Sequence, residues 1–244
     1  MTMPAFVSKG TAGTSIGDVC SGEYSVDTTL PGSINSGDVI VILFGGNGIL
    51  STIDSADTPS GYTAGLSTGI GTTVAAAMFY KVANGTEDST TVTVSGFFGG
   101  STAARVIAQS YVFSGSGTGG YHAVGGTNSG SSTTPSFASV TTTEANELAV
   151  GLMFAIVNTT VGDVTGETGG NWTEAAAEDT SSTRVVQCQT AQMASAGTIS
   201  GGTMTLGTGG PWKTLSFALK EIVAGGGAPP PRDPLRPFQH LLIR

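Results

Sequence analysis

Charged side chains are scarce in this sequence of 244 residues, because Asp, Glu, Lys and Arg together make up only 11% of it. Ordinary soluble domains carry roughly twice that share. The formal net charge is −8, with 9 basic residues against 17 acidic ones. Proteins that bind nucleic acids need Lys and Arg to neutralise phosphates. We therefore expect no nucleic-acid partner.

Cysteine and long apolar runs are scarce as well. Cys20 and Cys188 show no spacing typical of a metal site or redox motif, so we expect buried thiols, and the sequence leaves open whether they pair. The longest apolar candidate, residues 148–157, is far shorter than the ~18 residues that a transmembrane helix needs. Residues 1–7 lack the basic start of a secretory signal. We expect neither membrane insertion nor Sec export.

Glycine is abundant instead, with 38 residues, and Ser and Thr are frequent. The irregular spacing of the glycines excludes a collagen-like helix, and the apolar runs between them exclude a fully disordered chain. Gly, Ser and Thr favour turns and strands over helix interiors, while hydrophobic residues at 39% supply a core. The composition predicts an all-β protein without long helices.

Strand-like segments recur in the same order in the two halves of the chain. In the first half they are residues 38–44, 74–83, 89–95 and 105–113, and in the second half 147–157, 183–194, 202–206 and 212–222. The turn at residues 60–63, which contains Tyr62, has a counterpart at residues 170–173, which contains Trp172. We interpret this order as an internal duplication of roughly 110 residues.

The duplication predicts how the halves pack. One half, at residues 30–115 or 140–223, would form a sheet with an unburied face, and two such sheets facing each other bury both faces. An antiparallel hairpin is indicated by the apolar residues 74–83, the turn-forming residues 84–88 and the alternating residues 89–95. We predict an antiparallel β-sandwich domain over residues 1–224, built from two similar halves.

Residues 225–244 differ from this body. Gly225 to Gly227 form a flexible joint and Pro229 to Pro231 a stiff spacer. The apolar and basic side chains that follow are Arg232, Leu235, Arg236, Phe238, Leu241, Leu242, Ile243 and Arg244. Such a segment could fold back on its own domain. We favour an arm that docks on another subunit, because a joint and a spacer would be superfluous for folding back and free apolar residues invite aggregation.

Several turn and strand motifs resemble those of a family of bacteriophage and prophage virion proteins. They are Ser-Gly-Asp-Val-Ile-Val at 36–41, Thr-Pro-Ser-Gly-Tyr-Thr at 58–63, Phe-Tyr-Lys-Val-Ala-Asn-Gly at 79–85, Ser-Tyr-Val-Phe-Ser-Gly at 110–115, and the junctions at 134–143 and 146–151. The resemblance covers most of residues 30–223, with Tyr62 where the family pattern has Trp. It implies a jelly-roll-like sandwich on a phage particle, on the capsid or the tail.

From this resemblance and the arm we expect a non-enzymatic structural protein of the virion. It would decorate the outer surface of the capsid as a homotrimer. Its partners would be the major capsid or tail protein and copies of itself. The alternative is a tail or fibre module that binds host surface glycans through Tyr62, Tyr121 or Trp172. Tyr62 and Trp172 could equally cap the core beneath a turn, which is the commoner use.

Enzyme motifs are present only in incomplete form. The G-x-S-x-G pattern at residues 13–17 lacks the following helix and His partner of a nucleophile elbow, and the G-x-G-x-x-G run at residues 115–120 precedes no helix. The acids occur in loose groups: Asp54 with Asp57, Asp163 with Glu167, and Glu174 with Glu178 and Asp179. Solvated loop acids explain them better than a glycosidase pair or a calcium site. We expect no catalytic, cofactor-binding or metal-binding residues.

Overall fold

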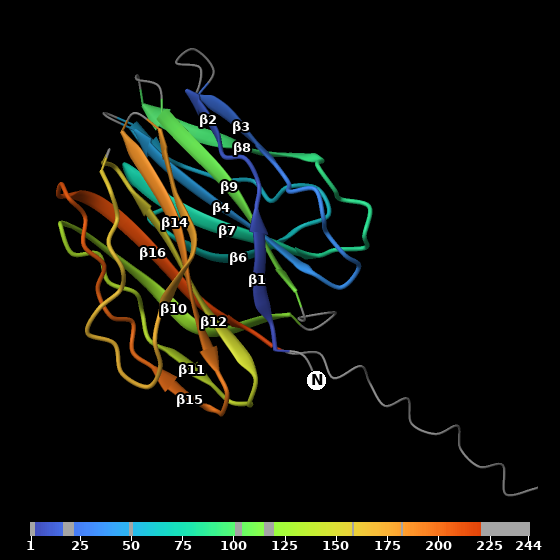
Figure 1. Cartoon of the computed structure of the whole chain (residues 1–244). Coiled ribbons are helices and arrows are strands. Elements are labelled where there is room, and N and C mark those ends of the chain that lie inside the picture. The colour runs from blue at the N-terminus through green and yellow to red at the C-terminus, as the bar shows by residue number, and fades with distance from the viewer. Residues whose placement is uncertain are drawn as a thin grey trace, which may run out of the picture.

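The protein is built from β-strands alone in the part of the chain that the structure describes (Figure 1). This computed structural model describes residues 3–16, 22–48, 51–100, 104–114, 120–157, 159–181 and 183–220. The paired strands run antiparallel throughout. The predicted fold class, an all-β antiparallel sandwich, is confirmed.

The first half of the chain forms a large and a small sheet. The large one has the order β1-β9-β4-β7-β6, with β2 also paired to β9, and the small one has the order β3-β8-β5. The strands of the large sheet are β1 (Ala5–Lys9), β2 (Gly13–Ile16), β4 (Val39–Gly48), β6 (Thr63–Thr68), β7 (Val74–Val82) and β9 (Ala104–Ser114). Those of the small sheet are β3 (Glu23–Thr29), β5 (Ser51–Ile53) and β8 (Thr91–Gly100).

The second half repeats this plan with β10-β16-β12-β14-β13 as its large sheet and β11-β15 as its small one. The large sheet contains β10 (Tyr121–Ser132), β12 (Glu147–Ala155), β13 (Thr173–Ser181), β14 (Arg184–Met193) and β16 (Gly210–Leu219). The small sheet contains β11 (Val140–Thr142) and β15 (Gly197–Ile199). Strands β9-β4-β7-β6 therefore correspond to β16-β12-β14-β13, so the halves are similar in strand order as well as in sequence.

The register makes the correspondence residue by residue. Val39 at the start of β4 lies opposite Phe113 of β9 and Val82 of β7. Leu148 near the start of β12 lies opposite Leu219 of β16 and Gln192 of β14. Val39 and Leu148 are thus equivalent, and every other pair on these strands follows by counting along them.

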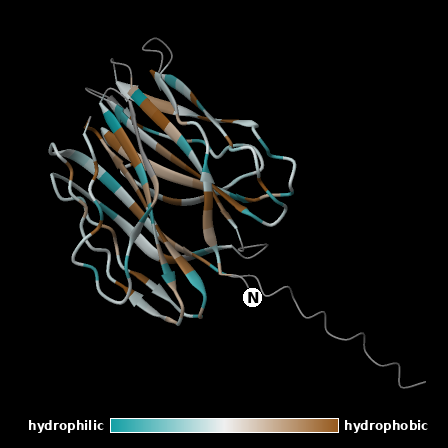
Figure 2. Cartoon of the chain, in the orientation of Figure 1, coloured by the Kyte–Doolittle hydropathy of each residue, from teal (hydrophilic) through white to brown (hydrophobic). Residues whose placement is uncertain are grey.

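The four sheets form four layers, with the two large sheets face to face in the middle. Residues such as Leu43 and Phe154 from the large sheets share one core between the halves. Each small sheet covers the outer face of its own large sheet over a separate core, which contains Phe44 in the first half and Met153 in the second. Hydrophobic residues are concentrated on these strands (Figure 2). The prediction of one sheet per half therefore undercounts the layers.

Burial on both faces explains the sequence of the central strands. Every residue of β4 and of β12 is buried, and apart from Asn47 and Glu147 neither strand contains a polar side chain. Strand β8 has one face towards solvent, and from Val92 to Phe98 its exposed residues alternate with more buried ones. The contrast between the two patterns separates inner-layer from outer-layer strands.

Two local predictions are wrong. Strands β7 and β8 do not form a hairpin, because β7 pairs with β4 and β6 while β8 pairs with β3 and β5. Residues 83–90 instead carry the chain from the large sheet to the small one. Residues 202–206 do not form a strand either, although Thr203 and Leu206 make isolated bridges. In both places the alternating sequence is real, but its partner lies elsewhere in the chain.

Candidate functional site

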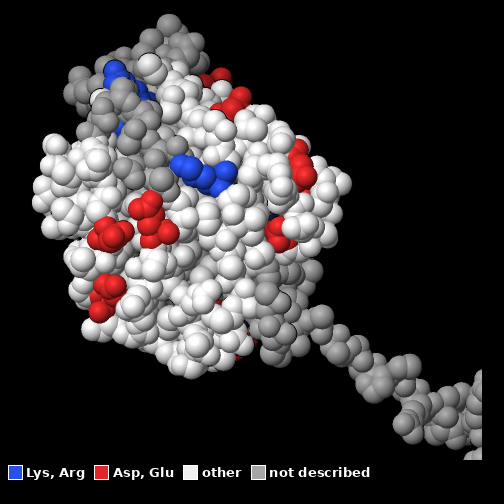
Figure 3. Space-filling model, in the orientation of Figure 1, with Lys and Arg blue, Asp and Glu red and all other residues white. Residues whose placement is uncertain are grey.

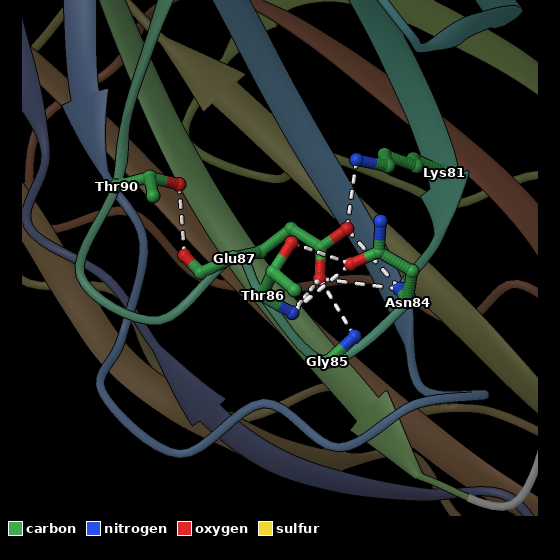
Figure 4. A network of polar contacts seen from close by, with 6 residues as sticks. All are labelled: Lys81, Asn84, Gly85, Thr86, Glu87 and Thr90. Carbon is green, nitrogen blue, oxygen red and sulfur yellow. Dashed lines mark hydrogen bonds and ion pairs between the residues drawn. The ribbon is translucent and has the colours of Figure 1, made fainter.

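The loop between β7 and β8 is organised around one buried carboxylate (Figure 4). Glu87 is 6% exposed, whereas Asn84, Gly85 and Thr86 are exposed. Its carboxylate accepts the backbone N–H of Asn84 at 3.1 and 3.2 Å, of Gly85 at 3.0 Å and of Thr86 at 3.0 Å. The ammonium of Lys81 lies 2.7 Å from the same carboxylate. Residues 84–87 of this connection thereby obtain a fixed conformation.

The electrostatics of this loop favour the charged form of Glu87. Burial alone would raise the pKa of its carboxyl group, since a charged group loses hydration. The hydrogen bond from Lys81 and those from the backbone of Asn84 and Thr86 outweigh that effect, and the pKa falls to about 2. Glu87 is therefore ionised at neutral pH and serves as a structural anion, not as a proton donor.

Equivalent acids start the two central strands. Asp38 accepts the backbone N–H of Asn35 at 2.8 Å, and Glu147 accepts that of Glu144 at 3.1 Å. The residue before each acid has a positive φ, 92° at Gly37 and 64° at Asn146. Such angles favour Gly and Asn, which explains why the two junctions differ in sequence but not in shape.

In the second half this junction is extended into a charged cluster near residue 220. Glu147 lies 2.9 Å from Nδ1 of His122 on β10, and Glu144 lies 2.6 Å from the ammonium of Lys220, which follows β16. Lys220 holds the pKa of the Glu144 carboxyl below its usual range. The cluster ties β10 and the start of β12 to Lys220, the last described residue of the chain.

The core between the halves includes an aromatic contact and a buried polar one. Tyr121 stacks on Tyr80 with ring centroids 4.5 Å apart and also contacts Phe217 at 5.6 Å. Arg184 donates through Nε to Oδ1 of Asn47 at 3.1 Å. Burial, with the nearby charge of Arg105, lowers the pKa of the Arg184 guanidinium to about 10. These contacts fix the two large sheets relative to each other.

The aromatic residues proposed for glycan contact lie against the core. Trp172 is 3% exposed, packs on Phe137 at 5.3 Å and donates its indole N–H to the carbonyl of Ser200 at 2.9 Å. Tyr62 is half-buried against the outer core of the first half, with Lys81 5.9 Å above its ring. This burial supports the core-capping alternative for Tyr62 and Trp172. Tyr121 packs against the core between the two large sheets.

The remaining predicted site residues are placed as follows. The docking residues Arg232, Leu235, Arg236, Phe238, Leu241, Leu242, Ile243 and Arg244 lie outside the described residues, as does Cys20. Cys188 is a buried free thiol in the core between the halves, and burial raises its pKa. The loop acids Asp54, Asp57 and Asp163 are exposed, as solvated acids should be.

In the described part of the chain, no group of three or more His, Cys, Asp or Glu residues could hold a metal ion. A pocket of about 220 Å³ beside β6 is lined by Asp54, Leu66 and Ile70 among others, and Asp54 is its one carboxylate. Charged side chains are few and scattered on the face shown in Figure 3. Among the described residues, no helix is long and apolar enough to cross a membrane.

The buried acids have a sequence signal of their own, although they belong to none of the enzyme motifs. Asp38 and Glu147 each stand immediately before an apolar run, and Glu87 follows one by a turn. An acid at the edge of a continuous apolar run becomes buried with it, and a buried carboxylate needs hydrogen-bond donors such as backbone N–H groups.

No protein-family model, curated protein or solved structure matches this chain.

Proposed function

We propose that this chain is a non-enzymatic structural protein of a phage particle, which decorates the capsid surface and is held there by residues 225–244. The observation that carries the proposal is that the residues in the motifs that resemble virion proteins have structural roles. Gly37 and Asp38 start a central strand, Tyr62 packs under a turn, and Lys81 holds the loop closed by Glu87. All of them serve the scaffold.

The sequence of the arm also supports the proposal. Lys220, the last described residue, pairs with Glu144 at the end of the last strand. The segment carries Arg232, Arg236 and Arg244 against Asp233 alone, whereas the whole chain has a net charge of −8. A basic, apolar arm on an acidic body favours an acidic and apolar groove on a neighbouring subunit. Many copies on one particle give avidity without strong single contacts.

Deleting residues 225–244 tests this function. Purified full-length and truncated proteins are added to particles that lack the protein, and co-sedimentation measures binding. We expect the truncated protein to lose binding while its thermal midpoint and circular dichroism stay unchanged. A matched variant, with Arg232, Arg236 and Arg244 changed to Ser, should bind more weakly and with less dependence on salt. Normal decoration by the truncated protein would overturn the proposal.

A further inference from the structure

The loop closed by Glu87 contains a peptide bond with an intrinsic chemical weakness. In an Asn-Gly pair the backbone nitrogen of the glycine can attack the side-chain Cγ of the asparagine, because glycine has no Cβ to hinder the approach. At Asn84 and Gly85 a bond would form between Gly85 N and Asn84 Cγ. The Cγ–Nδ2 bond breaks, and ammonia leaves with the proton from Gly85 N. Water then opens the succinimide ring to aspartate or isoaspartate.

Hydrogen bonds hold both reacting groups in place in the folded loop. The N–H of Gly85 donates to Oε2 of Glu87 at 3.0 Å. The side-chain oxygen of Asn84 accepts the backbone N–H of Thr86 at 3.0 Å and its hydroxyl at 2.7 Å. Three consecutive amides bound to one carboxylate also fix the backbone angles between Asn84 and Thr86, which would have to rotate before the ring could close.

We propose that Glu87 is a protecting residue and that Asn84 is a latent self-modification site, which converts to aspartate or isoaspartate when the carboxylate no longer holds the Gly85 amide. The site needs no co-reactant except water. Exposure of Asn84 and Gly85 gives that water access. Such a site would limit the chemical lifetime of the protein wherever the protein acts.

A second Asn-Gly pair supplies an internal control. Asn47 is 8% exposed within β4, and its side-chain oxygen accepts the Arg184 Nε–H at 3.1 Å. The N–H of Gly48 donates to the carbonyl of Thr73 at 3.0 Å. This pair has the same intrinsic chemistry, but its protection comes from the sheet and involves no contact with Glu87.

The experiment follows deamidation by peptide mass spectrometry of the full chain during incubation at neutral pH. Trypsin separates the two sites, because residues 10–81 contain Asn47 and residues 82–105 contain Asn84. In Glu87→Ala we expect conversion at Asn84 to be at least about tenfold faster than in the wild type, since the loop no longer needs to open first. Conversion at Asn47 should stay unchanged. Adding Asn84→Gln should abolish the mass gain in residues 82–105.

One further comparison decides the matter if Glu87→Ala perturbs the whole fold, which faster conversion at Asn47 would reveal. The wild type is then compared in buffer and in denaturing urea, and conversion at Asn84 should be at least about tenfold slower in the folded protein. Equal rates in the two conditions would overturn the proposal. An equal or slower rate at Asn84 in a folded Glu87→Ala variant would overturn it too, the slower rate because the carboxylate would then be acting as a base.

Discussion

At the scale of single residues, Glu87 makes the stability of the protein dependent on acid. Its pKa is about 2 in the folded protein, against an ordinary value of 4.5. A depressed pKa contributes stability that is fully present above the unfolded value and is lost as the pH falls through the folded one. The contribution therefore disappears between about pH 4.5 and pH 2, where Glu87 takes up a proton and its bonds to Lys81 and the loop amides weaken.

We predict that Glu87→Gln lowers the free energy of unfolding by about 2 kcal/mol at neutral pH, because the amide cannot satisfy three N–H groups and an ammonium as the carboxylate does. The gap to the wild type should shrink as the pH approaches 2. Urea titrations at several pH values measure it. Asp163→Asn, which changes an exposed acid, serves as the control with no gap. A gap for Glu87→Gln that stays constant with pH would contradict the prediction.

At the scale of elements, the sequence predicts strands better than it predicts their partners. The apolar runs of β4 and β12 and the alternation in β8 each identify a strand. A strand buried on both faces is apolar at successive positions, and a strand buried on one face is apolar at every second position. Whether the chain turns back beside β7 or crosses to another sheet depends on contacts with β3 and β4, distant in sequence. The Asn-Gly signal is common to both outcomes, so the hairpin prediction failed where the non-local pairing decided.

The equivalent outer cores of the halves differ in polarity. In the second half Gln189, Gly151 and Ser216 lie side by side on three strands, where the first half has Phe79, Ile42 and Ser110. Gln187 stands where the first half has Ala77. Gln187 and Gln189 are buried, and neither side-chain amide has a hydrogen-bond partner among the described residues. Buried amides without partners lower stability.

We therefore predict that Gln187→Met and Gln189→Met each raise the free energy of unfolding by about 1 kcal/mol, since methionine keeps the volume and removes the unpaired amide. Urea unfolding monitored by circular dichroism measures the change. The reverse exchange in the first half, Phe79→Gln, should lower stability instead. A loss of stability in both methionine variants would show that buried water already bonds these amides.

At the scale of the whole molecule, the shared core makes the two halves depend on each other. The inner faces of both large sheets are buried only because the other half covers them, and residues such as Leu43 and Leu152 lose their environment if one half unfolds. If one half unfolded alone, exposing the apolar face of the other half would cost a large part of the free energy of unfolding of a small domain. The two halves should therefore unfold in one cooperative transition.

Both tryptophans, Trp172 and Trp212, lie in the second half, so their fluorescence reports that half alone. We predict that Ile42→Ala, which empties part of the first half's own outer core, lowers the free energy of unfolding by about 2–4 kcal/mol. The fluorescence transition should shift together with the circular dichroism, because the second half cannot keep its fold without its neighbour. Phe97→Ala, at a side chain that is 49% exposed, should shift neither signal. An unmoved fluorescence midpoint in Ile42→Ala would mean that the halves unfold independently and that the core between them contributes little.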